Sequence, residues 1–171
     1  SRFFSEWTPR PPSSPHVPHT ALFRSRASVL GKGKLDTADL LRTVLDRESG
    51  LRTESLITHV GLFDAPGLDR LLYISDAGVV LNPTLHQKLK ITRNAVAVAH
   101  ALGLAMPKVA ILAAAEFVTE GMPATVDAAS LTKMADRGQI TGALVDGPFG
   151  LDNAVSVAAA EIKGLRGPVA G

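Results

Sequence analysis

The sequence from about residue 28 onward alternates between short apolar runs and longer segments of helical periodicity, and this order most constrains the fold. The apolar runs predict strands at 56–63, 71–75, 108–115 and 140–145. The segments between and after them predict helices at 36–50, 82–103, 125–138 and 152–164. Strands that alternate with helices form βαβ units. The pattern therefore predicts an α/β fold with a mostly parallel sheet covered by helices.

Each predicted helix begins at a residue that can cap its free N–H groups. The expected caps are Asp36 or Thr37, then Asn82 before Pro83, then Thr125, and finally Asp152 or Asn153. Gly50, Gly103, Gly138 and Gly164 are expected to end the helices. The runs 108–115 and 140–145 are continuous rather than alternating, which is typical of strands buried on both faces.

Residues 1–27 have a different composition from the rest of the chain. Five of the eleven prolines lie within residues 1–18. Proline fixes φ and removes a backbone donor, so we expect an extended or disordered leader at 1–27 and a folded domain at 28–171. A solvated tail and a proline-rich ligand for a partner domain are both compatible with this composition.

Charge and composition exclude several classes of protein. The net charge is +2, but residues 1–26 carry +3, so the remaining residues sum to −1. A basic stripe interleaved with aromatic residues is absent, and we expect no nucleic-acid partner. The longest apolar run, 109–115, is too short to span a membrane, and no secretory signal is recognisable. We expect no membrane partner and a cytoplasmic location. The chain contains no cysteine, which removes disulfides and thiolate chemistry.

Acidic residues follow three of the predicted strands. Asp76, Glu116 and Asp146 come at or just after the ends of the runs 71–75, 108–115 and 140–145. Ligands of parallel α/β sheets bind at the carboxyl ends of the strands, so these acids could line an active site. Aspartate also starts turns and caps helices without any ligand, and this structural reading stays open.

A phosphate site is suggested near the first helix. Residues 31–34 do not form a Walker A loop, because the required first glycine and final Ser or Thr are missing. Lys32 and Gly33, however, precede a helix that carries Thr37 at its start and Arg42 further along. Free N–H groups, a hydroxyl and a guanidinium could together bind phosphate. Capped helices with an exposed arginine are also common without a ligand.

Other catalytic arrangements find little support. The sequence has no His-x-x-x-His pair and no G-x-S-x-G elbow, so we expect no metal site and no serine hydrolase of the common α/β type. His86 and His100 share one helical segment and are interpreted as surface residues. His59 lies within an apolar run and is the histidine that we keep as a site candidate.

Several longer motifs resemble the phosphate acetyl/butyryl transferases, and more closely the butyryltransferase branch. The matching segments are 30–33 with 37–42, 50–53 with 58–60, 75–79 with 82–83, 122–129, 131–140, 145–148 and 152–154. They keep the order and spacing of the family from about residue 28 to residue 171.

The resemblance implies a reaction in which acyl-CoA and inorganic phosphate give acyl phosphate and coenzyme A. It places phosphate at Thr37 and Arg42, with Lys32 and Gly33 beside them. His59 and Asp76 would line the cleft as catalytic residues, with Asp146 at its far wall. Arg137 could serve the site or neutralise a helix C-terminus. No cofactor is implied, since the coenzyme A thioester is a substrate.

The resemblance also implies a two-domain architecture with three αβα layers, similar to isocitrate dehydrogenase, and a homo-oligomer. Relative to it, the sequence is interpreted as truncated at both ends, because the first half is replaced by the leader and the segment with the usual catalytic base would follow residue 171. Two hypotheses therefore stay open: an acyltransferase, either active as it stands or impaired by the truncation, or a silent fragment that binds coenzyme A or self-associates. A generic Rossmann-like module is a distant third, since its glycine fingerprint is absent.

Overall fold

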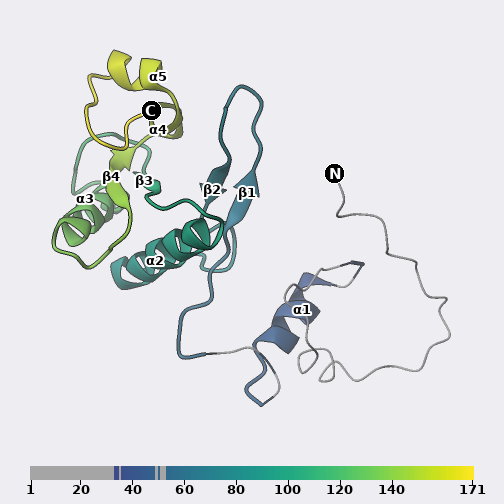
Figure 1. The fold of residues 1–171 in the computed structure, drawn as a ribbon. Helices are drawn as coiled ribbons and strands as arrows, with labels where there is room; N and C mark the ends of the chain where they lie inside the picture. Colours follow the sequence, from purple (N-terminus) through teal and green to yellow (C-terminus); the bar gives the residue numbers. More distant parts are fainter. Residues whose placement is uncertain (1–32, 35, 49, 51–52) are drawn as a thin grey trace. The chain divides into compact units, whose positions relative to one another are not determined.

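The computed structural model describes residues 33–34, 36–48, 50 and 53–171, which are coloured in Figure 1. Its backbone contacts divide the chain into two compact units, Ser1–Ser55 and Leu56–Gly171. In the first unit, helix α1 spans Thr37–Val44, and the carboxylate of Asp36 caps it by accepting the N–H of Ala38 at 2.8 Å. The predicted cap is confirmed, but the helix ends well before Gly50. The Gly50 N–H donates instead to the Asp46 carbonyl, at 3.2 Å.

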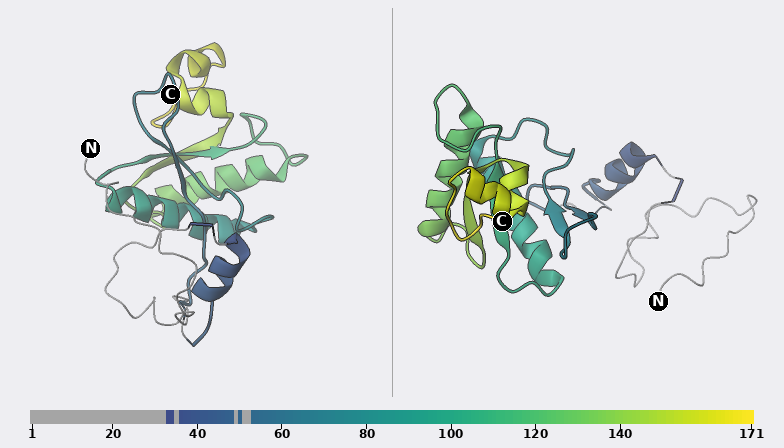
Figure 2. Two further views of the ribbon diagram at one scale, coloured as in Figure 1. Left: turned by 90° about the vertical axis from the view of Figure 1, so that its right-hand side faces the viewer. Right: turned by 90° about the horizontal axis from the view of Figure 1, so that it is seen from above.

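The second unit holds four strands and four helices in the part of the chain that the structure describes. In chain order these are β1 (Gly61–Phe63), β2 (Leu72–Ile74), α2 (Leu85–Ala101), β3 (Lys108–Leu112), α3 (Pro123–Asp136), β4 (Leu144–Phe149), α4 (Leu151–Val155) and α5 (Val157–Ile162). Helix α3 packs against β4 and β3, and α2 packs against α3 and β2. The short helices α4 and α5 lie beyond the end of β4 (Figures 1 and 2).

The described strands form two separate pairs rather than one mostly parallel sheet. Strands β1 and β2 are antiparallel, with Leu62 opposite Tyr73. The connection 64–71 contains the predicted turn at Pro66 and Gly67, and it is shorter than a parallel crossover requires. Strands β3 and β4 are parallel and are joined through α3, as a βαβ unit demands. The fold is therefore α/β, with one small sheet of each kind.

The hydrophobic core lies between α2, α3 and the parallel pair. Its centre consists of Leu89, Leu131, Ile140 and Val145, and Val109 and Ile111 of β3 pack against it. An ion pair of 2.6 Å between Lys88 of α2 and Asp127 of α3 closes one side. Leu89 of α2 and Leu131 of α3 thus mark the faces with which these helices pack on the core.

Three predicted boundaries were wrong in detail. Helix α2 is capped by Thr84 rather than Asn82, because Thr84 and Gln87 form a reciprocal capping box. Helix α3 begins at Pro123, so Thr125 lies inside it, with its hydroxyl bonded to the carbonyls of Thr119 and Met122. The last helix is two short helices, α4 and α5, and Ser156 caps the second by accepting the N–H of Ala159.

The parallel strands also differ from the prediction. Strand β4 begins at Leu144, where it pairs with Lys108, rather than at residue 140. Ile140 is buried in the loop before the strand, so its apolar character reflects packing on the core and not strand pairing. Leu112 is 45% exposed and Leu144 is 40% exposed, so the predicted burial on both faces is not observed along the runs 108–115 and 140–145.

Candidate active site

Asp76 follows β2, as predicted. Its carboxylate accepts backbone N–H groups from residues before β1 and after β2, the two strands of the antiparallel hairpin. One carboxylate oxygen accepts the N–H groups of Gly78 at 3.0 Å and Val79 at 2.8 Å, and the other accepts the N–H of His59 at 3.1 Å. The hydroxyl of Ser75 donates to the His59 carbonyl at 2.7 Å. The structure thus brings His59 and Asp76 together, through the backbone of His59 rather than its ring.

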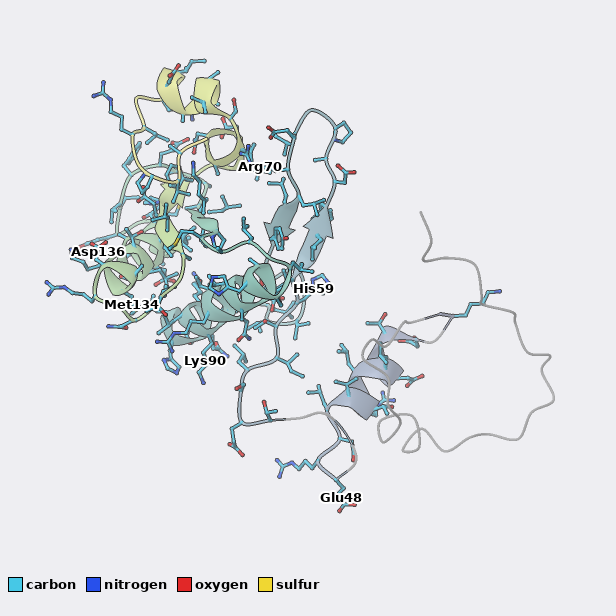
Figure 3. The ribbon with its side chains drawn as sticks, viewed as in Figure 1. Glu48, His59, Arg70, Lys90, Met134 and Asp136 are labelled. Atoms are coloured by element: carbon cyan, nitrogen blue, oxygen red, sulfur yellow. The ribbon has the colours of Figure 1, made fainter. Side chains whose placement is uncertain are left out.

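These hydrogen bonds lower the pKa of Asp76. Partial burial raises its pKa, but the N–H groups of Val79, His59 and Gly78 stabilise the carboxylate and together leave the pKa below its usual value. A carboxylate of lowered pKa that already accepts three N–H groups is a weak proton acceptor. The geometry favours a role for Asp76 in ordering the loop 75–79. The ring of His59 is exposed, beside β1 (Figure 3).

Asp146 lies within β4, not after it as predicted. It sits where the pairing between β3 and β4 shifts register, between the pairs Ala110–Asp146 and Leu112–Phe149. One carboxylate oxygen accepts the N–H of Gly147 at 2.8 Å. The other lies against Gly167, where a side chain would have no room, and it has no hydrogen-bond partner among the described residues. Asp146 is half-buried, and this second oxygen is the one that carries no hydrogen bond from the described residues.

The third acid, Glu116, is part of a polar cluster at the carboxyl end of the parallel strands. A single oxygen of Glu116 accepts the side-chain N–H of Asn153 at 3.0 Å and the ammonium of Lys163 at 2.6 Å. The hydrogen bond and charge of Lys163 lower the pKa of Glu116, and the pair raises the pKa of Lys163 in return. Asn153 is fully buried, and its Oδ1 has no partner. Glu116 is thus already engaged as an ion-pair acceptor.

The sequence analysis missed the partners in this cluster. Asn153 was interpreted as a helix cap, and Lys163 was not singled out. Both contact Glu116 across long stretches of sequence, so no local pattern could have identified them. A second long contact runs from Arg70, in the turn before β2, to the carbonyl of Val155 at 3.3 Å, and it ties the hairpin to α4 (Figure 3).

The residues predicted to bind phosphate lie in the first unit. Thr37 is the first residue of α1 and Gly33 is exposed before it, whereas Lys32 falls outside the described residues. Arg42 forms an ion pair with Asp39 of the same helix at 2.5 Å, and its side chain is 74% exposed. Thr37 and Arg42 are five residues apart, which is about 140° around a helix axis, so α1 does not bring them onto one face.

The remaining candidates from the sequence occupy the surface of the second unit. His86 and His100 are exposed on α2, and Arg137 is the C-cap residue of α3. Within the described ranges, no group of three or more histidine or acidic side chains is arranged to hold a metal ion. Of the helices in that same part of the chain, none has the length and apolarity to cross a membrane.

Comparison with known proteins places these features in one family. The family model for phosphate acetyl/butaryl transferase matches residues 20–171. A phosphate butyryltransferase of Clostridium beijerinckii is 52% identical over 145 residues, which cover 85% of this chain and 48% of the relative. A phosphate acetyltransferase of Thermotoga maritima is 46% identical over 151 residues, which cover 88% and 51%.

A solved structure agrees with the sequence relatives. The crystal structure of a branched-chain phosphotransacylase from Enterococcus faecalis V583 superimposes with a TM-score of 0.80 at 33% identity and covers 90% of this chain. The match covers 54% of the solved chain, so this chain spans about half the length of the relatives it matches. With a family match over most of its residues, the chain belongs to the phosphate acetyl/butaryl transferase family.

Proposed function

We propose that the chain serves in the transfer of an acyl group between coenzyme A and inorganic phosphate. In this reaction a phosphate oxygen attacks the thioester carbonyl carbon, the carbon–sulfur bond breaks, and the thiolate of coenzyme A takes up a proton. The observation that carries the proposal is the match to the family model over residues 20–171. Acyl-CoA and phosphate are water-soluble metabolites, which accords with action in the cytoplasm.

We assign phosphate binding to α1 and the residues before it. The first-turn N–H groups other than that of Ala38, which Asp36 already accepts, and the hydroxyl of Thr37 are suited to an oxyanion. Arg42 would have to exchange its partner Asp39 for the substrate, which costs little because that pair is exposed. Its long side chain would also have to reach around the helix, because it lies about 140° from Thr37. Lys32 and Gly33 complete the proposed set.

Asp146 is our preferred candidate for the group that exchanges a proton with the thiol. A thiol has an unperturbed pKa of about 8.5, so the reverse reaction needs a positioned base. Asp146 retains an oxygen that accepts no hydrogen bond from the described residues, whereas both oxygens of Asp76 accept backbone N–H groups. His59, whose ring is exposed, remains a second candidate.

We further propose the three-layer αβα architecture resembling isocitrate dehydrogenase, with residues 28–171 as the family domain and 1–27 as a leader outside it. In that arrangement β3 and β4 belong to a larger parallel sheet. The TM-score of 0.80 to a phosphotransacylase supports this proposal. A homo-oligomer is part of it, and light scattering on the purified chain measures that directly.

The test is thiol release from butyryl-CoA and acetyl-CoA in the presence of phosphate. Asp146→Asn is expected to lower turnover by about 10²–10⁴-fold, the usual loss when a general base is removed. Asp64→Asn makes the same charge change on an exposed loop and should leave turnover unchanged. Arg42→Lys should weaken phosphate binding, with Arg47→Lys as its control in the same unit, because lysine lacks the bidentate fork.

An alternative function is binding of coenzyme A, or self-association, without turnover. The observation that favours it is that two of the three acids, Asp76 and Glu116, are already engaged, by backbone N–H groups and by Lys163. Calorimetry distinguishes the two. Coenzyme A binding with no thiol release from either thioester would support the alternative, and measurable turnover would exclude it.

A further inference from the structure

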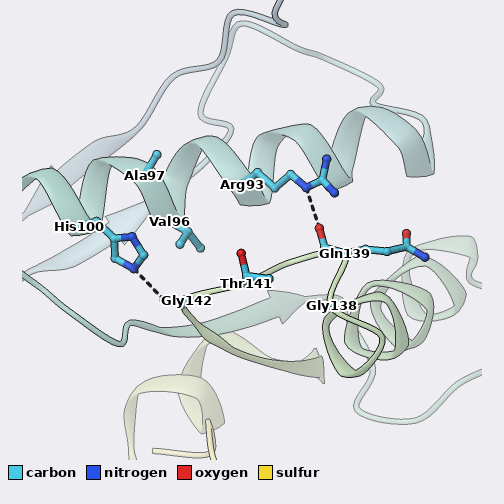
Figure 4. A pocket seen from close by; sticks show the side chains of 8 residues that line it. All are labelled: Arg93, Val96, Ala97, His100, Gly138, Gln139, Thr141 and Gly142. Atoms are coloured by element: carbon cyan, nitrogen blue, oxygen red, sulfur yellow. Dashed lines mark hydrogen bonds between the residues drawn. The ribbon is translucent and has the colours of Figure 1, made fainter.

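A hollow of about 380 Å³ lies between α2 and the loop 138–142 in the second unit, and none of the acids discussed above lines it (Figure 4). One wall is α2 and the other is the loop that joins α3 to β4. The lining residues are Arg93, Val96, Ala97, His100, Gly138, Gln139, Thr141 and Gly142. Gly138 and Gln139 belong to a segment that resembles the family, but neither the resemblance nor the proposed acyl transfer gives any lining residue a role.

Two hydrogen bonds hold the walls of the hollow together. Arg93 donates from Nε to the carbonyl of Gln139 at 2.7 Å, and His100 contacts the carbonyl of Gly142 through Nε2 at 2.7 Å. Because a carbonyl oxygen can only accept, Nε2 carries the proton. Gly142 has a φ of +74°, and a side chain there would collide with the His100 ring. The walls are thus fixed before any ligand arrives, which reduces the entropic cost of binding.

The chemistry of the lining is that of an oxyanion site. Arg93 donates to the loop through Nε alone, so the N–H groups of its two terminal nitrogens stay available. Within the described part of the chain it makes no ion pair. The Thr141 residue is exposed on the opposite wall, and its hydroxyl has no recorded partner among the same residues. None of the eight lining residues is acidic. Val96 and Ala97 supply a small apolar surface beside these donors.

We propose that this hollow binds a small oxyanion, a phosphate or a carboxylate group, through the guanidinium of Arg93 and the hydroxyl of Thr141. A guanidinium fork matches two oxygens of such a group at once, and an apolar surface beside it accommodates a short alkyl chain. The lining shares no residue with the phosphate site proposed at α1, and the proposal does not depend on whether the chain turns over acyl-CoA.

The experiment is a titration of the ¹⁵N-labelled full chain with sodium phosphate and, separately, with sodium butyrate, against sodium chloride at equal ionic strength. The amide signals of Gly138, Thr141 and Gly142 and the Nε signal of Arg93 report on the hollow. We expect saturable shifts with at least one oxyanion and none with chloride. Saturation by phosphate alone or by butyrate alone identifies which headgroup the site prefers.

Substitutions distinguish binding in this hollow from a general effect of positive charge on the protein surface. Arg93→Gln should weaken the affinity about tenfold, the effect of losing a charge-assisted hydrogen bond. Arg137→Gln makes the same charge change at an exposed residue next to the loop, outside the lining, and should leave the affinity within about twofold. Thr141→Val removes only the hydroxyl and should weaken oxyanion binding by less than Arg93→Gln does. If Arg93→Gln fails to fold, the affinity of Thr141→Val tests the proposal on its own. Equal losses in both arginine variants, unchanged affinity in Thr141→Val, or shifts no larger than with chloride would overturn the proposal.

Discussion

Asp76→Asn tests whether this aspartate orders the hairpin rather than acting as a proton acceptor. The substitution keeps the size and one carbonyl oxygen, which can still accept the N–H groups of Gly78 and Val79. The oxygen that accepts the His59 N–H at 3.1 Å becomes an amide nitrogen, so two donors then face each other. The variant therefore loses one hydrogen bond outright and the negative charge from the other two.

The magnitude follows from the number and exposure of these bonds. An unsatisfied backbone donor costs about 1–3 kcal/mol, and bonds to an ionised acceptor are worth more than neutral ones. Because Asp76 is only half-buried, water replaces part of the loss. We therefore expect a decrease of about 1–2 kcal/mol in the free energy of unfolding of the second unit. For a unit of this size that corresponds to a fall in Tm of about 3–6 °C.

The pH dependence gives an independent check. Since the folded pKa of Asp76 is lowered, its contribution is fully present above the unfolded pKa of about 3.9 and is lost as the pH falls through the folded value. The stability difference between wild type and Asp76→Asn should thus be constant near pH 7 and shrink below about pH 4.

Thermal unfolding followed by circular dichroism at several pH values measures this difference. Asp64→Asn is the control, because Asp64 is exposed on the turn between β1 and β2 and has no recorded partner among the described residues. Equal Tm changes in the two variants, or a difference that persists unchanged under strongly acidic conditions, would refute the reasoning.

Three further predictions concern the second unit. Gly147→Ala should lower the free energy of unfolding, measured by urea denaturation, by about 1–3 kcal/mol, because a Cβ would lie 2.7 Å from a carbonyl oxygen of β3. Gly121→Ala should have little effect, because its Cβ would meet only the Thr119 hydroxyl, at 3.9 Å. Leu131→Ala should cost about 2–5 kcal/mol, since this side chain is 1% exposed at the centre of the core, and a smaller loss would show that the core collapses around the cavity. Lys163→Met should raise the pKa of Glu116 toward its ordinary value in an NMR titration, because the ammonium no longer favours the carboxylate; an unchanged titration would disprove the coupling.

The sequence predicted the long helices well because their signals are local. Apolar residues repeat every three to four positions in α2 and α3, and these faces form the core with Leu89 and Leu131. The first residue of a helix was harder to predict where two possible N-cap residues lie close together in the sequence. Asn82 and Thr84 are both good caps, and only the bond between Thr84 and Gln87 decides which one begins the helix.

Strands were harder to predict because their limits depend on partners distant in sequence. The run 140–145 is apolar throughout, but pairing with β3 begins only at Leu144. Gly142, with a φ of +74°, lies in the turn before the strand, and Ile140 is apolar because it fills the core. Composition alone cannot distinguish a buried loop residue from a buried strand residue.

The candidate site shows the same limit more sharply, since its acids are alike in sequence and different in structure. Asp76 and Asp146 each follow a short apolar run and each precede a glycine within two residues. Asp76 accepts three backbone N–H groups, which stabilise its charge, while Asp146 accepts one and keeps an oxygen open at the register shift of β4. Glu116, the third acid, is already paired with Lys163. All three acids were predicted as site candidates because they follow the carboxyl ends of strands. Their chemistry, however, depends on the number of hydrogen-bond donors around each carboxylate. That number is set by folded backbone, and it singles out Asp146 as the acid to replace first.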